Sequence, residues 1–177
     1  MTDFISINPK YRNDAFQRYK IPKLDCFVTL RGNGTFTTIN NLKDVAKNLF
    51  HPHDILFKAI GYYLATNINM KNNTIKGAHE HNQIQDAIDK YITTFVLCPK
   101  CTIPELSYSV TGKKKKMKCE YKCSACGENG DIEIVSKEDN KILQLIIKHI
   151  SSGNKWPKHS TALLDEEIHD LIFPFDL

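Results

Sequence analysis

Apolar residues recur at every third or fourth position in four stretches of this chain. This period places one side of each stretch against a core, which is the pattern of an amphipathic helix. Three of these helices are expected between residues 41 and 96, and the fourth after residue 136. The apolar stripes are Leu42, Val45, Ala46 and Leu49; Ile55, Leu56, Ala59, Ile60, Tyr63 and Leu64; Ile84, Ala87, Ile88, Tyr91, Ile92 and Phe95; and Ile142, Leu143, Ile146, Ile147 and Ile150.

Two runs ahead of the first helix have the composition of strands. Residues 24–30 and 35–39 are rich in apolar and β-branched side chains, and Arg31-Gly32-Asn33-Gly34 lies between them. Glycine and asparagine tolerate positive φ, so this tetrapeptide is a turn signal. The pattern therefore predicts a β-hairpin.

Several residues mark where the helices begin and end. Asn41 is placed to cap the first helix, with Asp44 three residues on, and Pro52 fits the first turn of the second. The polar residues 67–73 indicate a turn, and residues 154–160 have the composition of a linker.

The composition excludes a membrane protein. At 177 residues and 20.3 kDa the chain is long enough for one ordinary domain or two small ones. No apolar run approaches the roughly 18 residues that cross a bilayer, and residues 1–20 contain no secretory signal. We expect a cytoplasmic monomer. The Lys, Ile and Asn bias suggests a reduced genome such as that of a parasite or a large virus, for which the compartment is the host cytoplasm.

Charge is distributed unevenly along the chain. The whole chain carries +4, and residues 160–177 carry −5 without any Lys or Arg, so residues 1–159 carry +9. A basic body favours contact with nucleic acid or acidic protein surfaces. The acidic tail must face something else or fold back. Its acidic residues are Asp165, Glu166, Glu167, Asp170 and Asp176.

Two Cys-x-x-Cys pairs are the strongest chemical signal in the sequence. Cys98 and Cys101 form the first pair, Cys123 and Cys126 the second, and 21 residues separate the pairs. Each pair aims two thiolates at one point, and a hairpin formed by residues 107–122 would bring the pairs together around a tetrahedral ion. Four cysteine ligands leave no open coordination position, so we expect one structural Zn²⁺.

Alternatives to this interpretation stay open from the residues alone. The cysteines could be ordinary reduced thiols, or one pair could serve redox chemistry. Cys119 is a competing ligand four residues before Cys123, and Cys26 alternates with apolar neighbours as a core residue would. The lysines of the ribbon tip are either a solvated loop or a phosphate contact. They are Lys113, Lys114, Lys115, Lys116 and Lys118.

These observations predict an α+β chain in which a small α/β domain precedes a four-cysteine zinc ribbon and a C-terminal helix. The expected divisions are a flexible N-terminal arm (1–20), an α/β domain (21–96), the zinc ribbon (97–136), a helix packed on the body (137–152), and a linker with an acidic tail (153–177).

Four segments also carry a resemblance to a known family. They are Phe16-Gln17-Arg18-Tyr19-Lys20-Ile21-Pro22, Arg31-Gly32-Asn33-Gly34, Gly77-Ala78-His79-Glu80, and Phe95-Val96-Leu97-Cys98-Pro99-Lys100-Cys101. In this order, over residues 12–150, they look like the N-terminal half of eukaryotic translation initiation factor 5, which is related to the beta subunit of initiation factor 2. Family members continue into a C-terminal helical repeat domain, so the resemblance implies a chain that lacks it.

The resemblance implies a role in start-codon recognition. Such a protein binds the complex of factor 2, GTP and initiator tRNA on the small ribosomal subunit and stimulates GTP hydrolysis. It is not itself an enzyme, because the hydrolase is the factor 2 gamma subunit. Arg18 matches the family's arginine finger, and Lys58 matches a supporting basic residue. By themselves, these two side chains would be an arginine in a floppy arm and a surface lysine. Phe36 stands where the family usually has lysine.

The resemblance also implies RNA contacts and partners. Arg31, Gly32, Asn33 and Gly34 match the loop that approaches the initiator tRNA. From their charge rather than from the resemblance, Lys113, Lys114, Lys115 and Lys116 are the candidate contact to ribosomal RNA. The protein partners would be the gamma and beta subunits of factor 2.

Two other functions remain open at this stage. Phe36 and the short chain favour a non-activating mimic that competes with factor 5 and alters start-codon selection. A generic zinc-ribbon RNA-binding protein is the third possibility. Residues 163–177 would be either a docking helix for initiation factors or a helix folded onto the body.

Overall fold

A computed structural model of the chain describes residues 3–12, 14–32, 34–112 and 117–157. The α+β fold class is confirmed, with helices and strands in one chain. The helices are α1 (Leu42–Asn48), α2 (His53–Tyr63), α3 (His81–Phe95) and α4 (Lys137–Ser151), with a 3-10 turn at Pro9–Tyr11. The strands are β1 (Phe4–Ser6), β2 (Lys20–Pro22), β3 (Cys26–Arg31), β4 (Gly34–Ile39), β5 (Ile68–Asn69), β6 (Thr74–Lys76), β7 (Leu106–Thr111), β8 (Lys118–Cys123) and β9 (Asn129–Asp131).

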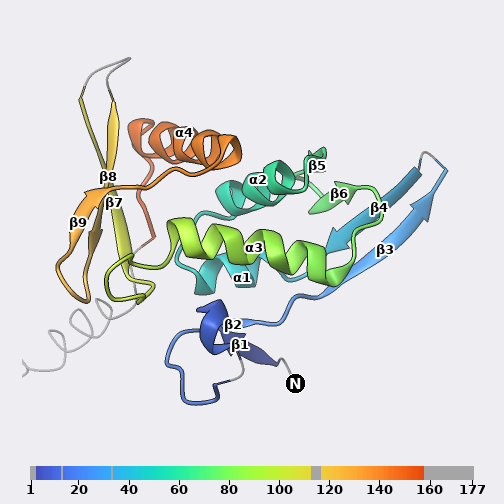
Figure 1. Ribbon diagram of the computed structural model, residues 1–177. Helices are drawn as coiled ribbons and strands as arrows, with labels where there is room; N and C mark the ends of the chain where they lie inside the picture. Colours follow the sequence, from blue (N-terminus) through green and yellow to red (C-terminus); the bar gives the residue numbers. More distant parts are fainter. Residues whose placement is uncertain (1–2, 13, 33, 113–116, 158–177) are drawn as a thin grey trace, which may run out of the picture.

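The helices lie between two β structures at opposite ends of the molecule. The hairpin β3–β4 projects from one end, and the ribbon β7–β8–β9 stands at the other (Figure 1). In the described residues the strands form three antiparallel sheets, ordered β1-β2, β3-β4-β6-β5 and β7-β8-β9. The candidate sites predicted from the sequence are therefore spread along the whole length of the fold.

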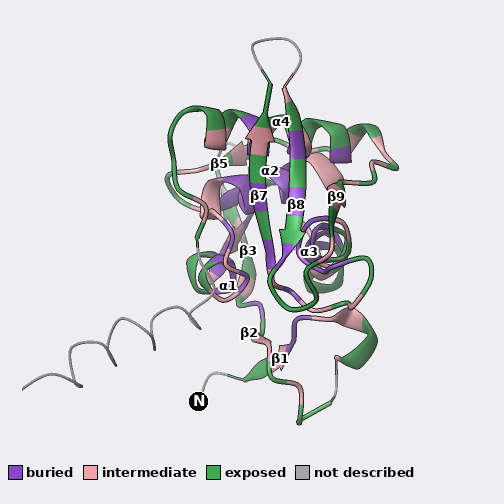
Figure 2. Ribbon diagram, turned by 90° about the vertical axis from the view of Figure 1, so that its left-hand side faces the viewer, coloured by how far each residue is buried: buried purple, intermediate pink, exposed green. Residues whose placement is uncertain are grey.

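The helical stripes form the core as their period predicts. The central helix α2 packs against α1, α3 and α4. Tyr91, Phe57 and Phe95 are among the largest side chains with under 2% exposure. Phe57 lies outside the predicted stripe of α2, yet it is fully buried, because α2 is covered from more than one side. The buried residues of the helices lie inward, away from solvent (Figure 2).

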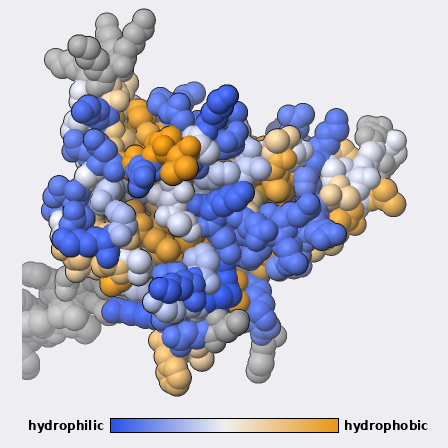
Figure 3. Space-filling view, in the orientation of Figure 1, coloured by the Kyte–Doolittle hydropathy of each residue, from blue (hydrophilic) through white to orange (hydrophobic). Residues whose placement is uncertain are grey.

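The predicted hairpin is confirmed, with Arg31 paired to Gly34 next to the turn. Its strands extend beyond the helical layer, so several apolar side chains remain in contact with water. Phe27 and Val28 are 50% exposed and Leu30 is 82% exposed. Figure 3 shows this apolar surface at the projecting end of the molecule.

The prediction that the Asn41 side chain caps α1 is wrong. Asn41 occupies the N-cap position but makes no side-chain cap bond. Its amide instead donates to the Lys23 carbonyl at 2.6 Å and accepts from the Asp25 N–H at 2.9 Å. The side chain thus joins α1 to the segment between β2 and β3, a tertiary contact that the local sequence does not reveal.

Residues 3–20 contain more structure than a flexible arm. Strand β1 pairs with β2, with Ile5 opposite Ile21, and Ile7 is 1% exposed. Three-residue strands paired across such a separation have no local period, which is why the pattern does not reveal them. The stretch that protrudes, at the bottom of Figure 1, is the loop of residues 14–18, in which Arg18 is exposed.

The C-terminal helix is fastened to the body at both ends. Near its start, Asp139 accepts a hydrogen bond from the Tyr63 hydroxyl of α2 at 2.6 Å. Beyond its end, in the predicted linker, the Trp156 ring lies 4.8 Å from the rings of both His51 and Tyr108 in edge-on geometry. The acidic tail predicted at 160–177 lies outside the described residues.

In the part of the chain that the structure describes, no helix has the length and apolar character needed to cross a bilayer.

Candidate metal centre and arginine loop

The two Cys-x-x-Cys segments fold into matching turns. In the first, the Cys98 N–H donates to the Ile103 carbonyl and the Thr102 N–H donates back to the Cys98 carbonyl, at 3.0 and 2.8 Å. In the second, Cys123 and Glu128 are joined in the same way, and the Gly127 N–H donates to the Cys123 carbonyl, at 2.8 and 3.0 Å. Each turn therefore presents two thiols from an equivalent backbone frame.

A left-handed residue closes each turn. Gly127 has φ +76° and Thr102 has φ +58°. Glycine adopts this conformation readily, whereas a β-branched residue does so at a cost. Glycine at position 127 suits a tight turn, but nothing in the sequence signals that Thr102 takes the same role.

The four cysteine sulfurs of these turns converge on one point. All four Sγ atoms lie within 4.8 Å of one another. Cys98 Sγ is 3.7 Å from Cys126 Sγ, and Cys101 Sγ is 3.7 Å from Cys123 Sγ. Metal–sulfur bonds of about 2.3 Å in tetrahedral geometry would put neighbouring sulfurs about 3.8 Å apart. These two distances match a tetrahedral site, and the four sulfurs lie close enough together to share one metal ion.

The protonation of the cluster is linked to metal binding. Burial raises the pKa of Cys123 to about 12, while the backbone N–H of Glu128 lowers the pKa of the exposed Cys126 thiol. Because a metal binds thiolates, filling the cluster releases protons at neutral pH. Across the cluster, Lys100 Nζ donates to Glu128 Oε2 at 2.6 Å and ties the two turns together.

The remaining cysteines take no part in the cluster. Cys119, the competing ligand considered from its spacing, lies on β8 with its side chain buried, and burial raises its pKa to about 11. Strand β8 alternates exposed and buried residues (Figure 2), so Cys119, Tyr121 and Cys123 face inward. Cys26 is only half-buried on β3, although it packs against the core.

Arg18 is exposed at the end of the protruding loop. Its Cζ atom lies 5.7 Å from the centre of the Tyr19 ring. Asp14 shapes the loop: its carboxylate accepts from the Phe16 N–H at 2.9 Å and from the Gln17 amide at 3.2 Å. Phe16, at 97% exposure, also points into water. The loop therefore presents a guanidinium and an aromatic ring two residues apart.

Both ends of this loop are fastened to the body. On one side, Arg12 forms an ion pair with Asp89 of α3. On the other, the Tyr19 hydroxyl donates to Glu105, which lies between the first cysteine pair and β7. Burial, with the Glu105 hydrogen bond, raises the pKa of Tyr19 to about 12, so the hydroxyl stays a donor at neutral pH.

The other predicted site residues lie elsewhere in the fold. Lys58 is half-buried on α2, and α2 and the arginine loop lie on opposite sides of α3 (Figures 1 and 2). Of the hairpin loop, Gly32 is exposed and Gly34 has φ +128°. Asn33 and Lys113, Lys114, Lys115 and Lys116 lie outside the described residues, as does the side chain of Arg31.

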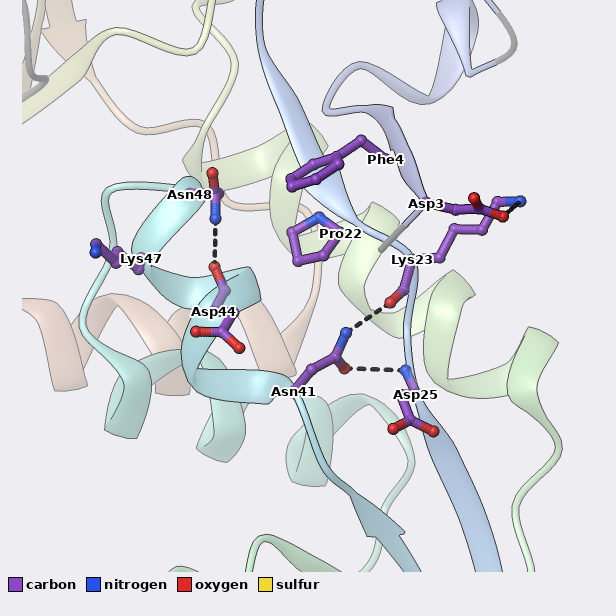
Figure 4. A pocket seen from close by; sticks show the side chains of 9 residues that line it. All are labelled: Asp3, Phe4, Pro22, Lys23, Asp25, Asn41, Asp44, Lys47 and Asn48. Atoms are coloured by element: carbon purple, nitrogen blue, oxygen red, sulfur yellow. Dashed lines mark hydrogen bonds and ion pairs between the residues drawn. The ribbon is translucent and has the colours of Figure 1, made fainter. Parts of the chain in front are cut away.

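A polar pocket lies beside β2 and α1 (Figure 4). Much of its polar lining is paired internally: Lys23 with Asp3 at 3.0 Å, and Asn48 with the Asp44 carbonyl at 2.8 Å. Asn41, through its hydrogen bonds to the backbone of Lys23 and Asp25, joins the two sides of the pocket. The pocket is therefore better explained by the packing of α1 than by a ligand.

Sequence reasoning missed the pair Tyr19 and Glu105. Their positions are 86 residues apart, and neither lies in an unusual local pattern. The adjacency of Tyr19 to Arg18 was a signal that could have drawn attention to it, whereas Glu105 had none.

Comparison with known proteins identifies relatives of this arrangement. Residues 9–129 match a family described as a domain found in initiation factors 2B and 5. The chain is 38% identical over 141 residues to eukaryotic translation initiation factor 5 of Mus musculus, covering 77% of this chain and 32% of that protein. It is 35% identical over 150 residues to the probable factor 5 of Schizosaccharomyces pombe, covering 82% and 36%. The chain thus spans about a third of the length of these relatives.

Proposed function

The chain belongs to the translation initiation factor family that carries the domain shared by factors 2B and 5, and we propose that it acts on initiation factor 2 as factor 5 does. In this proposal it binds the complex of factor 2, GTP and initiator tRNA on the small ribosomal subunit. There it stimulates GTP hydrolysis by the gamma subunit when the start codon is recognised. This stimulation of GTP hydrolysis would take place in the cytoplasm, or in the host cytoplasm if the source is a virus.

The presentation of Arg18 is the observation that supports this proposal. Stimulation in trans requires a cation that protrudes far enough to enter another protein's nucleotide site. Arg18 is exposed on a loop held at both ends, so it protrudes without being detached. Its guanidinium would donate several hydrogen bonds to the charge that develops on the transferring phosphoryl group.

The cysteine cluster has a structural role in this proposal. We assign one Zn²⁺ to Cys98, Cys101, Cys123 and Cys126, whose sulfur spacing suits a tetrahedral ion. Four thiolates saturate the ion, so it supplies folding energy to the ribbon rather than chemistry.

The remaining predicted residues are assigned to binding. Lys58 would support the contact with factor 2 from another face than Arg18. The hairpin loop 31–34 would contact the initiator tRNA, and the lysines 113–116 would contact RNA of the small subunit. Separate faces suit a protein that bridges several partners at once.

The decisive experiment measures GTP hydrolysis by factor 2 bound to initiator tRNA and small subunits. We expect Arg18→Ala to lower the stimulated rate by about 10³-fold or more. Lys10→Ala is the matched control, since it removes an exposed cation from the same segment. Equal rates for the wild type and Arg18→Ala would eliminate the activator role.

A second function is favoured by Phe36. This residue is half-buried on β4, where the resemblance leads one to expect lysine, although the exposed Lys76 of β6 lies directly across from it. If the protein binds the initiation complex but leaves the hydrolysis rate unchanged, it is instead a competitor of factor 5 that alters start-codon selection. The same assay, run with factor 5 present, separates the two: a competitor lowers the rate.

A further inference from the structure

We propose that Tyr19 and Glu105 are positioning residues that fasten the Arg18 loop to the metal ribbon, so that the metal state of the ribbon controls where Arg18 stands. This rests on the proposed function for its effect on GTP hydrolysis. The mechanical link is argued from the contacts alone.

Glu105 is held by the second cysteine turn. Its carbonyl accepts a hydrogen bond at 3.0 Å from the N–H of Ser124, which lies between Cys123 and Cys126. The next residue, Leu106, pairs with Cys123 in the β7–β8 ladder. The backbone of Glu105 is therefore fixed by the turn whose two cysteines would hold the ion.

The first cysteine turn faces the same loop from the other side. A small hollow separates it from the N-terminal segment, with residues of the turn on one wall and residues of the segment on the other. The turn contributes Thr102, Ile103 and Pro104, and the segment contributes Ser6, Asn8, Tyr11, Gln17 and Tyr19. Loss of the metal would release the turn that forms this wall, because its backbone frame closes around Cys98.

Tyr19 connects the fixed Glu105 to the loop. Its hydroxyl donates to the Glu105 carboxylate, and its carbonyl accepts the Ile7 N–H at 3.0 Å. Ile7 is buried in the core at 1% exposure. Tyr19 therefore joins the ribbon to Ile7, the residue that follows β1, and Arg18 immediately precedes Tyr19.

The two ends of the loop differ in their dependence on metal. Arg12 is paired with Asp89 of α3, a helix whose buried face belongs to the helical core. Tyr19 is paired with Glu105 of the ribbon. Removing the metal would therefore loosen the side-chain contact of Tyr19 at the end nearer to Arg18, where only the backbone bonds of Tyr19 and β2 remain, while the Arg12 end is unaffected. An arginine loosened in this way samples more positions. Ordering it in the partner's site therefore costs more conformational entropy.

Hydrogen exchange of the zinc-loaded full chain tests the link without any partner. Tyr19→Phe removes one hydroxyl and keeps the ring. We expect the Ile7 amide to exchange about tenfold faster in this variant and in Glu105→Ala, because a hydrogen bond to a carboxylate is lost. Tyr11→Phe, the same change on an exposed ring of the same segment, is the control. Cobalt in place of zinc gives a thiolate absorption band that verifies an intact cluster in each variant.

Metal removal completes the test. In the wild type, a chelator should accelerate Ile7 exchange, whereas in Tyr19→Phe, in which the link is already cut, it should add little. The proposal is overturned if Tyr19→Phe exchanges like Tyr11→Phe, or if metal removal acts equally on the wild type and Tyr19→Phe.

The hydrolysis assay adds a readout that a purely structural role would not move. Tyr19→Phe should lower the maximal stimulated rate and leave the concentration for half-maximal stimulation unchanged, as expected for a misplaced finger rather than weaker binding. If Arg18→Ala leaves hydrolysis unchanged, the proposed function fails, but the exchange experiment still decides the link between Tyr19 and the ribbon.

Discussion

Replacement of Asp139 by alanine tests how helices α2 and α4 are joined. The Asp139 carboxylate is buried at 5% exposure and accepts hydrogen bonds from the Tyr63 hydroxyl at 2.6 Å and the Ser136 N–H at 2.9 Å. Hydrogen bonds to charged groups contribute about 1.5 to 3 kcal/mol each. Since alanine also leaves the Tyr63 hydroxyl unpaired, we expect Asp139→Ala to lower the free energy of unfolding by about 3 kcal/mol at pH 7.

The size of this effect depends on pH. Burial acts to raise the pKa of Asp139, but the hydrogen bonds from Tyr63 and Ser136 outweigh it and hold the pKa below its usual value. A carboxyl group whose pKa is lower in the folded state stabilises the protein above its unfolded pKa, and this stabilisation is lost as the pH falls through the folded pKa. The difference between wild type and Asp139→Ala should therefore be full at pH 7 and shrink below about pH 4.

Urea unfolding of the zinc-loaded protein, followed by circular dichroism, measures the effect. A cycle with Tyr63→Phe and the double variant isolates the pair, with an expected coupling of at least about 1 kcal/mol. Asp86→Ala, at an exposed position of α3, is the control. At low pH the comparison uses the difference between proteins, because protonation of the cysteines destabilises all of them alike.

A coupling energy below about 0.3 kcal/mol, which is the ordinary scatter of independent sites, would refute the assigned contact. So would a stability loss in Asp139→Ala that equals the loss in Asp86→Ala.

Three further predictions concern other parts of the fold. Chelation of the metal should unfold the ribbon, and less chelator should be needed at lower pH, because protons compete with the metal for the thiolates. Loss of β-structure, followed by circular dichroism, measures the unfolding, and metal release that does not depend on pH would contradict the thiolate ligands. Trp156→Ala should lower the free energy of unfolding by about 2 to 4 kcal/mol, since it empties the site between His51 and Tyr108; thermal melting measures this, and an unchanged melting temperature would show that the C-terminal segment is not docked. Gly61→Ala should destabilise the protein despite the better helix propensity of alanine, because a Cβ there would lie 2.7 Å from Ile68 Cγ2; Ile68→Ala in the same background should restore part of the loss.

The helices were largely predictable because they bury one face at a fixed period. The stripe of α3, from Ile84 to Phe95, is buried as predicted, and the ribbon strands β7 and β8 match the hairpin expected between the cysteine pairs. The convergence of the four thiols was predictable for a similar reason, since the spacing of each pair restricts its local geometry.

What could not be predicted depends on contacts between distant residues. Strands β5 and β6 flank a turn that the sequence marks only as polar, and β6 gains its partner from β4. Trp156 lies in a segment that has the composition of a linker, yet its ring packs against His51 and Tyr108, which lie far earlier in the chain. Nor does the composition around Arg18 reveal that its neighbour Tyr19 is tied to Glu105.

Strand β3 affects how the protein behaves in concentrated solution. It is the edge strand of its sheet, so in the described residues one row of its backbone N–H and C=O groups has no neighbouring strand. Leu30 adds an exposed apolar side chain to this edge. A row of this kind is a template on which identical molecules can stack. Colloidal stability is then governed by a surface that stays folded throughout, and a melting curve gives no warning of it.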